Sequence, residues 1–222
     1  MSVGDKRKRS VFEDSLVAGD SDALVTEKAN PVVFIDVQIL PLTQAAAVAA
    51  ADKSNKGEKL PQPSRVMIEL FEDKTPMAAA NFRQLCTGEA KQRGVGVGYK
   101  DCPFHKGVIG KFLAGGDFTR KDGTGSFSIH KPLDHFADEA DVGSLERVGH
   151  VEPGMVSLVK PEGKQNGSQF CVILSAIPQL DGVQQVVGRV CGRSEEEREA
   201  SLAALSDAAD RLHTKRNRVV IS

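Results

Sequence analysis

The sequence CPFHKGVIGKFLAGGDF, residues 102–118, divides short apolar runs by four glycines, two of them adjacent at Gly115 and Gly116. Because glycine permits tight turns and close backbone approach, we interpret this pair mainly as structural. Short apolar runs continue to about residue 190, and glycine-containing turns separate them at GTG 123–125, PG 153–154, NG 166–167 and DG 181–182. Such spacing is typical of an antiparallel sheet or barrel of short strands.

The segment PVVFIDVQI, residues 31–39, lies upstream of this region and is rich in β-branched and aromatic side chains. It predicts a buried strand, with RVMIELF, residues 65–71, as its partner. Between them we expect a surface insertion at about 40–64, partly helical because it contains an alanine-rich stretch. Residues 1–29 are charged and poor in aromatic residues, so we expect a flexible extension before a folded domain over 30–222.

An amphipathic helix is predicted for TPMAAANFRQLC, residues 75–86. Thr75 suits the N-cap, Pro76 suits the first helical position, and Gly88 is placed to end the helix. The apolar face that should cover a core consists of Ala79, Phe82 and Cys86.

A second helix is predicted for residues 194–212, where Ser194 and Glu197 form a capping box. The residues expected on its buried side are Leu202, Leu205 and Ala209. The final VVIS, residues 219–222, predicts a last strand. Many short strands with two helices indicate a small antiparallel barrel that is closed at its ends by the helices.

Composition narrows the function classes. Lys and Arg total 29 against 30 Asp and Glu, so a net charge of −1 gives no general attraction to nucleic acid or to membranes. No apolar run approaches 18 residues and no signal-peptide core is present, so we expect a protein of the nucleus or cytoplasm. The basic cluster KRKR at 6–9 is either a nuclear-import signal or a solvated charge run. The four cysteines lie far apart without a C-x-x-C pair, which argues against zinc and against a disulfide framework.

Seven blocks of the sequence recur in the order, and nearly the spacing, seen in cyclophilins. They are NPVVFIDVQI, IELFEDKTPMAAANFRQLCTGE, GYKDCPFHK, GGDFTRKDGTG, HVEPGMVSLVK, NGSQF and QLDGVQQVVGRV. The chain resembles that family over roughly residues 30–222, apart from the insertion. The resemblance implies a mainly β fold, a closed eight-stranded antiparallel barrel capped by two α-helices.

The same resemblance implies peptidyl-prolyl cis-trans isomerase chemistry on proline-containing peptides or proteins, in a monomer without a metal or organic cofactor. The loop GEAKQRGVGVGYK, residues 88–100, looks most like the loop of spliceosomal snRNP-associated cyclophilins, as does the closing VVIS. A nuclear ribonucleoprotein assembly is therefore a candidate partner, with no direct contact to nucleic acid and no contact with a membrane.

Isomerisation of an X-Pro bond requires no covalent step. Its barrier is about 18–20 kcal/mol because twisting destroys amide resonance. An apolar pocket for the proline ring and hydrogen-bond donors that favour the twisted amide can supply catalysis. The resemblance places Lys106 where the family has an arginine and retains the family's glutamine at Gln169, so these two are the catalytic candidates. Lysine offers a point charge in place of a planar fork, which weakens the key donor.

The resemblance also implies a set of substrate-binding residues. They are His105, Lys111, Phe112, Ala114, Val159, Lys160, Cys171, Gln179, Leu180 and Gln184. Without gaps, Lys111 takes the position of a pocket phenylalanine and Phe112 that of the following methionine; a one-residue shift would give Phe112 the phenylalanine position instead. His105 is either part of this set or a histidine that the backbone satisfies and that supports the loop.

Several members of the set differ from the family types. Val159, Lys160 and Pro161 replace an Ala-Asn-Ala segment, and Pro161 has no N–H to offer a peptide. The other replacements are Ala114 for a glutamine, Cys171 for a floor phenylalanine, Gln179 for a tryptophan and Gln184 for a histidine, while Leu180 keeps the family type. We expect Cys171 to act as a small apolar side chain in the core and not as a reactive thiol.

Three functions remain open at this stage. The chain is an isomerase of reduced rate, or a binding and assembly module with weak or absent isomerase activity, or a passive barrel whose function lies in the extension and the insertion. We favour the binding module slightly, because the loss of several donors together should cost more than any single loss.

Overall fold

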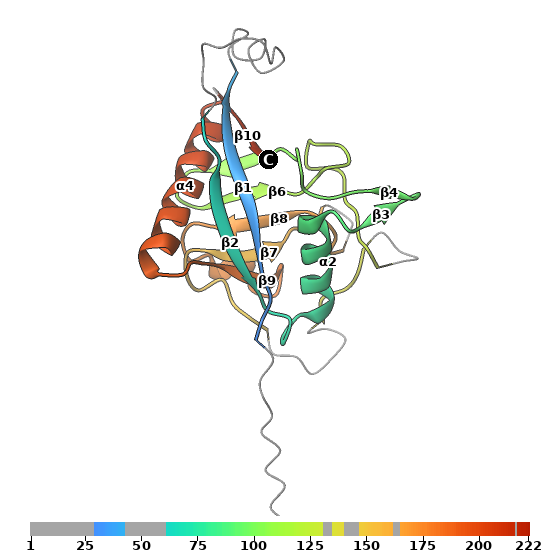
Figure 1. The fold of residues 1–222 in the computed structure, drawn as a ribbon. Coiled ribbons are helices and arrows are strands. Elements are labelled where there is room, and N and C mark those ends of the chain that lie inside the picture. The colour runs from blue at the N-terminus through green and yellow to red at the C-terminus, as the bar shows by residue number, and fades with distance from the viewer. Residues whose placement is uncertain (1–28, 43–60, 131–134, 140–146, 162–164, 216) are drawn as a thin grey trace, which may run out of the picture.

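The computed structural model describes residues 29–42, 61–130, 135–139, 147–161, 165–215 and 217–222. These residues form one curled, eight-stranded antiparallel sheet, a separate two-stranded ribbon and two α-helices (Figure 1). The mainly β fold with two helices is thereby confirmed. Nearly all of the predicted extension, and most of the predicted insertion, lie outside the described residues.

The elements follow the predicted order closely. The strands of the large sheet are β1 (Val32–Pro41), β2 (Ser64–Leu70), β5 (Lys106–Val108), β6 (Phe112–Gly115), β7 (Met155–Leu158), β8 (Phe170–Ile173), β9 (Gln185–Cys191) and β10 (Asn217–Ile221). The ribbon consists of β3 (Lys91–Gln92) and β4 (Val95–Gly96), and the helices are α2 (Pro76–Thr87), α4 (Glu195–His213) and the short 3-10 helix η1 (Pro178–Leu180). Hydrogen-bonded neighbours run in the order β10-β1-β2-β9-β7-β8-β6-β5. The predicted pairing of 31–39 with 65–71 is confirmed as β1 with β2.

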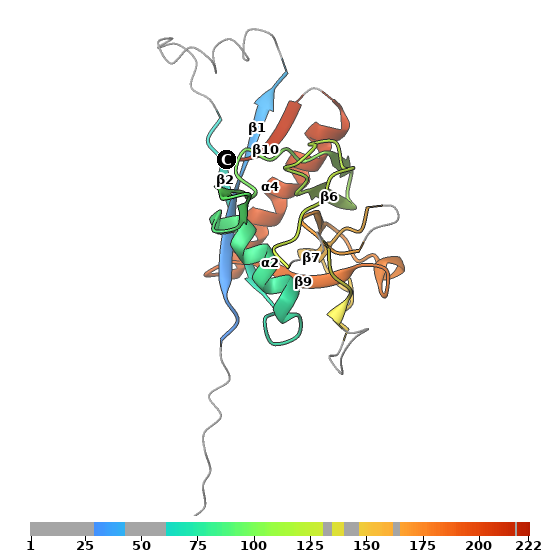
Figure 2. The same ribbon diagram turned by 90° about the vertical axis from the view of Figure 1, so that its right-hand side faces the viewer.

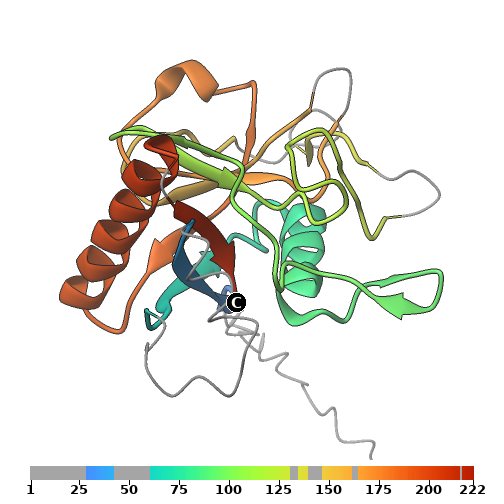
Figure 3. The ribbon, with the colours of Figure 1, turned by 90° about the horizontal axis from the view of Figure 1, so that it is seen from above.

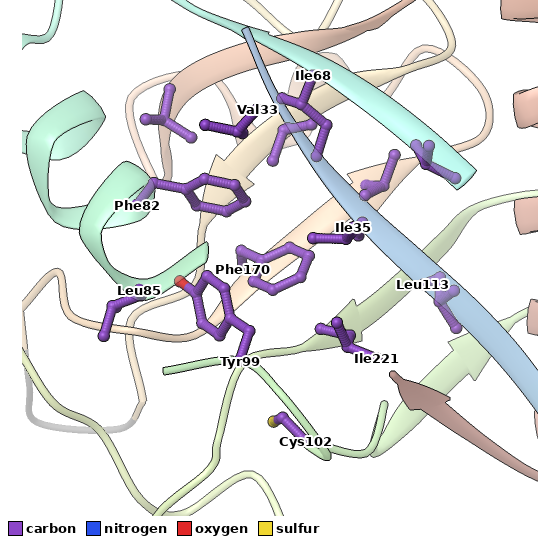
Figure 4. Packing of buried hydrophobic residues seen from close by; sticks show 14 of the residues in the cluster. Val33, Ile35, Ile68, Phe82, Leu85, Tyr99, Cys102, Leu113, Phe170 and Ile221 are labelled. Carbon is purple, nitrogen blue, oxygen red and sulfur yellow. The ribbon is translucent and has the colours of Figure 1, made fainter. Parts of the chain in front are cut away.

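The main core lies between the sheet and its helices. Phe82 of α2, Tyr99 and Phe170 of β8 are fully buried, and their ring centroids lie 5.1 to 5.3 Å apart (Figure 4). Such inclined aromatic contacts add about 0.5–1.5 kcal/mol per pair beyond the burial of apolar area. Viewed from above, α2 and α4 lie on opposite sides of the strands (Figure 3). The core therefore fixes α2 against the inner face of the sheet.

The sheet curls, but its ladder does not close into a complete barrel. Within the described residues, β10 and β5 are the two ends of the strand order. The segment before β5 joins β10 through one isolated bridge, Pro103 with Val220. Two hydrogen bonds of 2.9 Å flank this bridge. Phe104 N donates to the Val219 carbonyl, and Ile221 N donates to the Cys102 carbonyl. Proline has no N–H and cannot donate to a ladder, so the pairing between this segment and β10 does not extend into a continuous ladder. The closed barrel of the sequence prediction is thus corrected to a half-barrel, and α4 packs against both β5 and β10.

The first predicted helix is confirmed as α2, and Thr75 occupies the predicted N-cap position, but its side chain makes no capping hydrogen bond. The Thr75 hydroxyl donates to the Phe71 carbonyl at 3.0 Å and does not cap the helix. The buried carboxylate of Glu139 accepts hydrogen bonds from the backbone of Met77 at 2.6 Å and of Ala78 at 3.0 Å. A carboxylate at this end also matches the positive end of the helix dipole. The first turn is therefore stabilised by a residue some sixty positions away, which local sequence does not reveal.

The second predicted helix is confirmed as α4, which runs beside the sheet on the side away from α2 (Figure 2). The Ser194 hydroxyl accepts from Glu197 N at 3.3 Å, as the capping box requires. The Glu197 carboxylate accepts from the backbone and the guanidinium of Arg193. Leu205 and Ala209 are buried as expected. No helix in the described part of the chain is both long enough and apolar enough to cross a membrane.

Candidate functional site

A second apolar cluster lies on the face of the sheet that points away from the main core. Successive strand residues point to opposite faces, so Leu113, Val156 and Val172 join the main core while their neighbours face outward. We call the outward group the outer-face cluster. Its buried members are Ala114, Met155, Cys171, Ile173 and Val186, and packed against them are the partly buried Phe71, Phe112, Val148, Val159, Ile177 and Leu180.

Strand register places one line of residues across the outer-face cluster. Lys106 pairs with Ala114, Ala114 with Cys171, Cys171 with Ser157, and Ser157 with Val186. Neighbouring strands lie about 4.8 Å apart. A cationic side chain thus stands at one end of a row of buried side chains, and the partly buried Phe112 and Leu180 pack against this row.

The cation of this row lies close to an aromatic ring. The Nζ of exposed Lys106 is 5.7 Å from the centroid of the Phe112 ring, within the range of a cation–π contact. Phe112 pairs with Ile173 and belongs to the outer-face cluster, while Lys111 is exposed in the β5–β6 turn. The structure places Phe112 on the apolar surface, which both alignments above allow, and leaves Lys111 exposed in the turn.

Ser157 and Cys171 of this row form a polar floor together with the side chain of Gln184. The Gln184 Oε1 accepts hydrogen bonds from the Ser157 hydroxyl at 2.9 Å and from the Cys171 thiol at 3.2 Å. The Ser157 and Cys171 side chains are buried, and their Oγ and Sγ atoms lie 3.3 Å apart. Burial raises the pKa of the Cys171 thiol to about 11, so the thiol keeps its proton near neutral pH. The sequence prediction of an unreactive Cys171 agrees with this environment.

The structure brings together seven of the twelve residues proposed from sequence. They are Lys106, Phe112, Ala114, Val159, Cys171, Leu180 and Gln184. Four of the remaining five point elsewhere or bond elsewhere, as described next, and Lys111 is the fifth. Ser157 was missed, although it lies two positions after Met155 in β7 and therefore on the same face of the strand.

Gln169 directs its side chain into the structure. It is buried, and its Nε2 donates to the carbonyl of Gly123 at 2.8 Å and to that of Gly125. Both hydrogens of the amide group are thereby used within the protein. Gln169 fixes the 117–125 loop in this state and has no amide hydrogen left for a peptide.

Three further candidates are not members of the outer-face cluster. The ring of His105 lies against the 117–125 loop, where a Cβ on Gly123 would touch it, and burial lowers the pKa of this histidine. Lys160 Nζ forms an ion pair with the buried Asp138 carboxylate at 2.8 Å. Gln179 is exposed on η1. These positions follow from loop packing, which has no periodic signal in the sequence.

The 117–125 loop is organised around one buried carboxylate. Asp117 accepts hydrogen bonds from backbone N–H groups and one hydroxyl, donated by Thr119, Arg120, Asp122, Gly123 and Gly125. Burial alone would raise the pKa of Asp117, but the donors, with Arg120, Gly125, Thr119 and Gly123 foremost, hold it far below its ordinary value. The ionised carboxylate is therefore the state that this loop stabilises.

This arrangement predicts a loss of stability in acid. The pKa of Asp117 is lowered in the folded protein relative to about 3.9 in the unfolded chain. Its contribution is therefore fully present above pH 4 and is lost as the pH falls toward the folded-state pKa. We expect the free energy of unfolding, measured by urea titration, to change little from Asp117 between pH 7 and 5 and to fall below pH 4. The fall should be shallower in Asp117→Asn; an equally steep fall would contradict this assignment.

Asp181 and His150 hold the loop that carries Leu180 and Gln184. Asp181 Oδ1 accepts from the backbone of His150 at 2.7 Å and contacts its Nδ1 at 2.8 Å. These hydrogen bonds, from the backbone first and the ring second, lower the pKa of Asp181. His150 is fully buried, and its carbonyl accepts from Ile177 N. The segment around His150 thus fixes one wall of the outer-face cluster.

Comparison with known proteins gives one family. The model of the family described as cyclophilin type peptidyl-prolyl cis-trans isomerase/CLD matches residues 59–219. The chain is 43% identical over 126 residues to peptidyl-prolyl cis-trans isomerase H of Rhizopus delemar, covering 57% of this chain and 67% of that protein. It is 43% identical over 125 residues to peptidyl-prolyl cis-trans isomerase 11 of Caenorhabditis elegans, covering 56% and 64%. It is 36% identical over 165 residues to peptidyl-prolyl cis-trans isomerase CYP22 of Arabidopsis thaliana, covering 73% and 69%.

Proposed function

Because the chain belongs to the cyclophilin-type peptidyl-prolyl cis-trans isomerase family, whose members act on proline-containing peptides, we propose that it binds such peptides on the outer-face cluster and isomerises them slowly. The observation that carries the proposal is the apolar row between Lys106 and Val186, with Lys106 Nζ beside the Phe112 ring. A proline ring gains binding energy from such a surface because apolar area leaves water. The function is that of a binding and assembly module with weak isomerase activity.

In this mechanism the apolar side chains and the cation have separate tasks. Phe112, Leu180 and Val159 grip the proline ring, and Lys106 donates a hydrogen bond to a neighbouring carbonyl. Rotation about the X-Pro bond then proceeds without a covalent intermediate, since only interactions stronger in the twisted state lower the barrier.

The low rate follows from the small number of fixed donors. Lys106 is exposed and supplies one mobile ammonium group, Ala114 has no polar atom in its side chain, and Gln169 uses its amide hydrogens on the 117–125 loop. Loss of one preorganised donor typically costs about 100- to 1,000-fold in rate. An isomerase of ordinary rate is the second candidate. The position of Lys106 Nζ over the ring of Phe112, in a cluster that also contains Leu180, favours it.

The test compares turnover with binding in the unmodified protein. In a protease-coupled assay with an X-Pro peptide we expect turnover at least about 100-fold below that of a cyclophilin with arginine at the Lys106 position. Calorimetry should still detect binding of a proline peptide and none of its alanine analogue. Turnover at the usual rate would favour the active-isomerase candidate, and equal binding of both peptides would reject the outer-face cluster as a proline site.

The wider setting is also a proposal. We propose that the protein acts in the nucleus or cytoplasm on proline-containing proteins, with a nuclear ribonucleoprotein assembly as the leading partner class. The KRKR cluster at 6–9 supports import, since short basic runs can serve as import signals. A fluorescent fusion without residues 1–12 should lose nuclear enrichment relative to the full chain. An unchanged distribution would show that the cluster is a solvated charge run.

A further inference from the structure

The carboxamide of Gln184 reaches into the middle of the apolar row. Gln184 follows η1, and its backbone N–H donates to the Leu180 carbonyl at 3.0 Å. From there the half-buried side chain extends to Ser157 on β7 and Cys171 on β8. A loop residue thus delivers a polar group to a part of the sheet where the neighbouring position, Ala114, has none.

The two contacts orient this carboxamide. A carboxamide has one acceptor oxygen and one NH₂ group with two donors. Because the Ser157 hydroxyl and the Cys171 thiol both meet Oε1, the NH₂ group must point away from the floor. Within the described residues, no protein group accepts a hydrogen bond from Gln184 Nε2, and this atom is not sealed from solvent. The NH₂ group is therefore an oriented donor available to a ligand.

Strand register sets the separation of Lys106 from Cys171, the residue beneath the Gln184 carboxamide. Cys171 pairs with Ala114, and Ala114 pairs with Lys106, so two strand spacings of about 4.8 Å each place Cys171 roughly 10 Å from Lys106. An extended peptide advances about 3.3 Å per residue. The backbone positions of Lys106 and Cys171 are therefore separated by about the length of three extended residues, with Ala114 between them.

We propose that Gln184 is the second hydrogen-bond donor of this site, held toward a backbone carbonyl of the bound peptide by Ser157 and Cys171 acting as positioning residues. The proposal rests on the proposed function, because it assumes a proline peptide on the outer-face cluster. It defines a two-point recognition: Lys106 takes a carbonyl on one side of the proline and Gln184 a carbonyl on the other. Ser157 contributes to affinity from beneath the carboxamide, without touching the peptide.

The experiment measures the affinity of a proline peptide by calorimetry, and kcat and KM in the coupled assay. Gln184→Glu keeps an acceptor for Ser157 and Cys171 but has no amide hydrogens, so we expect affinity to fall about three- to tenfold. Ser157→Ala releases the carboxamide and should weaken affinity about two- to fivefold. Gln92→Glu is the matched control, because it makes the same chemical change on exposed β3 of the separate ribbon and should leave affinity within twofold of the unmodified protein.

A swap of positions separates a donor role from a packing role. Gln184→Ala should lose affinity, and adding Ala114→Gln should restore at least half of the lost factor, since position 114 adjoins Cys171 in the register. In the unmodified background Ala114→Gln meets the carboxamide already there and should give no gain, a non-additive pattern typical of groups that share one role. Thermal unfolding checks that each variant is folded.

The outcomes distinguish this inference from the proposed function. If the unmodified protein binds the proline peptide but Gln184→Glu and Ser157→Ala bind it equally well, the inference is wrong and the proposed function stands. If the unmodified protein does not bind the peptide, the proposed function fails and this inference fails with it. Weakened binding in both variants, with an unaffected Gln92→Glu control, supports the inference.

Discussion

Lys106→Arg raises kcat/KM for an X-Pro peptide at least about tenfold and changes peptide affinity by less than threefold. A preorganised donor is worth about 100- to 1,000-fold in rate, and the planar guanidinium makes two aligned hydrogen bonds where the ammonium makes mobile ones. Lys106 is exposed on β5 and paired with the small Ala114, so the larger side chain has space beside the Phe112 ring. The gain should appear mainly in kcat, because the fork fits the twisted amide better than the planar one.

The matched control for this experiment is Lys111→Arg, which makes the same change in the turn of the same hairpin. Lys111 is exposed and lies outside the outer-face cluster, so its replacement should leave kcat/KM unchanged. If Lys106→Arg also leaves kcat/KM unchanged, the role of Lys106 as a donor to the peptide is wrong. A gain of equal size in affinity and in turnover would show uniform binding instead of catalysis.

Asp117→Asn lowers the free energy of unfolding by about 3 kcal/mol or more, as measured by urea titration at pH 7. The Oδ2 atom of Asp117 accepts from the backbone N–H groups of Asp122, Gly123 and Gly125. The side chain of an asparagine has only one acceptor oxygen. Its NH₂ group must therefore face either these donors or the Thr119 and Arg120 donors on the other side. Buried N–H groups are then left without an acceptor, which is the costly case.

The control for this loss is Asp207→Asn, on the exposed side of α4. Asp207 pairs with Arg211 one turn away, and exposed pairs of this kind contribute about 0.3–0.5 kcal/mol. The Asp117 variant should also weaken peptide binding, because Gln169 anchors β8 to the same loop. A change below 1 kcal/mol in Asp117→Asn would show that the loop does not depend on this carboxylate.

The local pattern of the sequence was sufficient for the elements and the family. A high content of β-branched and aromatic residues predicted β1 and its pairing with β2, capping residues predicted α4, and ordered blocks identified the family. The structural interpretation of Gly115 and Gly116 is supported as well: a Cβ at Gly115 would strike the ring of Phe104, and one at Gly116, where φ is +87°, would strike the Ser168 carbonyl. These features depend on neighbours in the chain or on steric space, and both leave a readable signal.

The direction of polar side chains was decided only by tertiary structure. The sequence placed Gln169 among the catalytic candidates, yet its amide hydrogens bind the 117–125 loop. Thr75 had the right type for a cap, yet Glu139 supplies the carboxylate from another segment. Ser157 and Gln184 meet although 27 positions separate them. Backbone periodicity determines which face of a strand a residue occupies, whereas a hydrogen bond depends on which distant segment comes within about 3 Å, and only the packed chain fixes that distance.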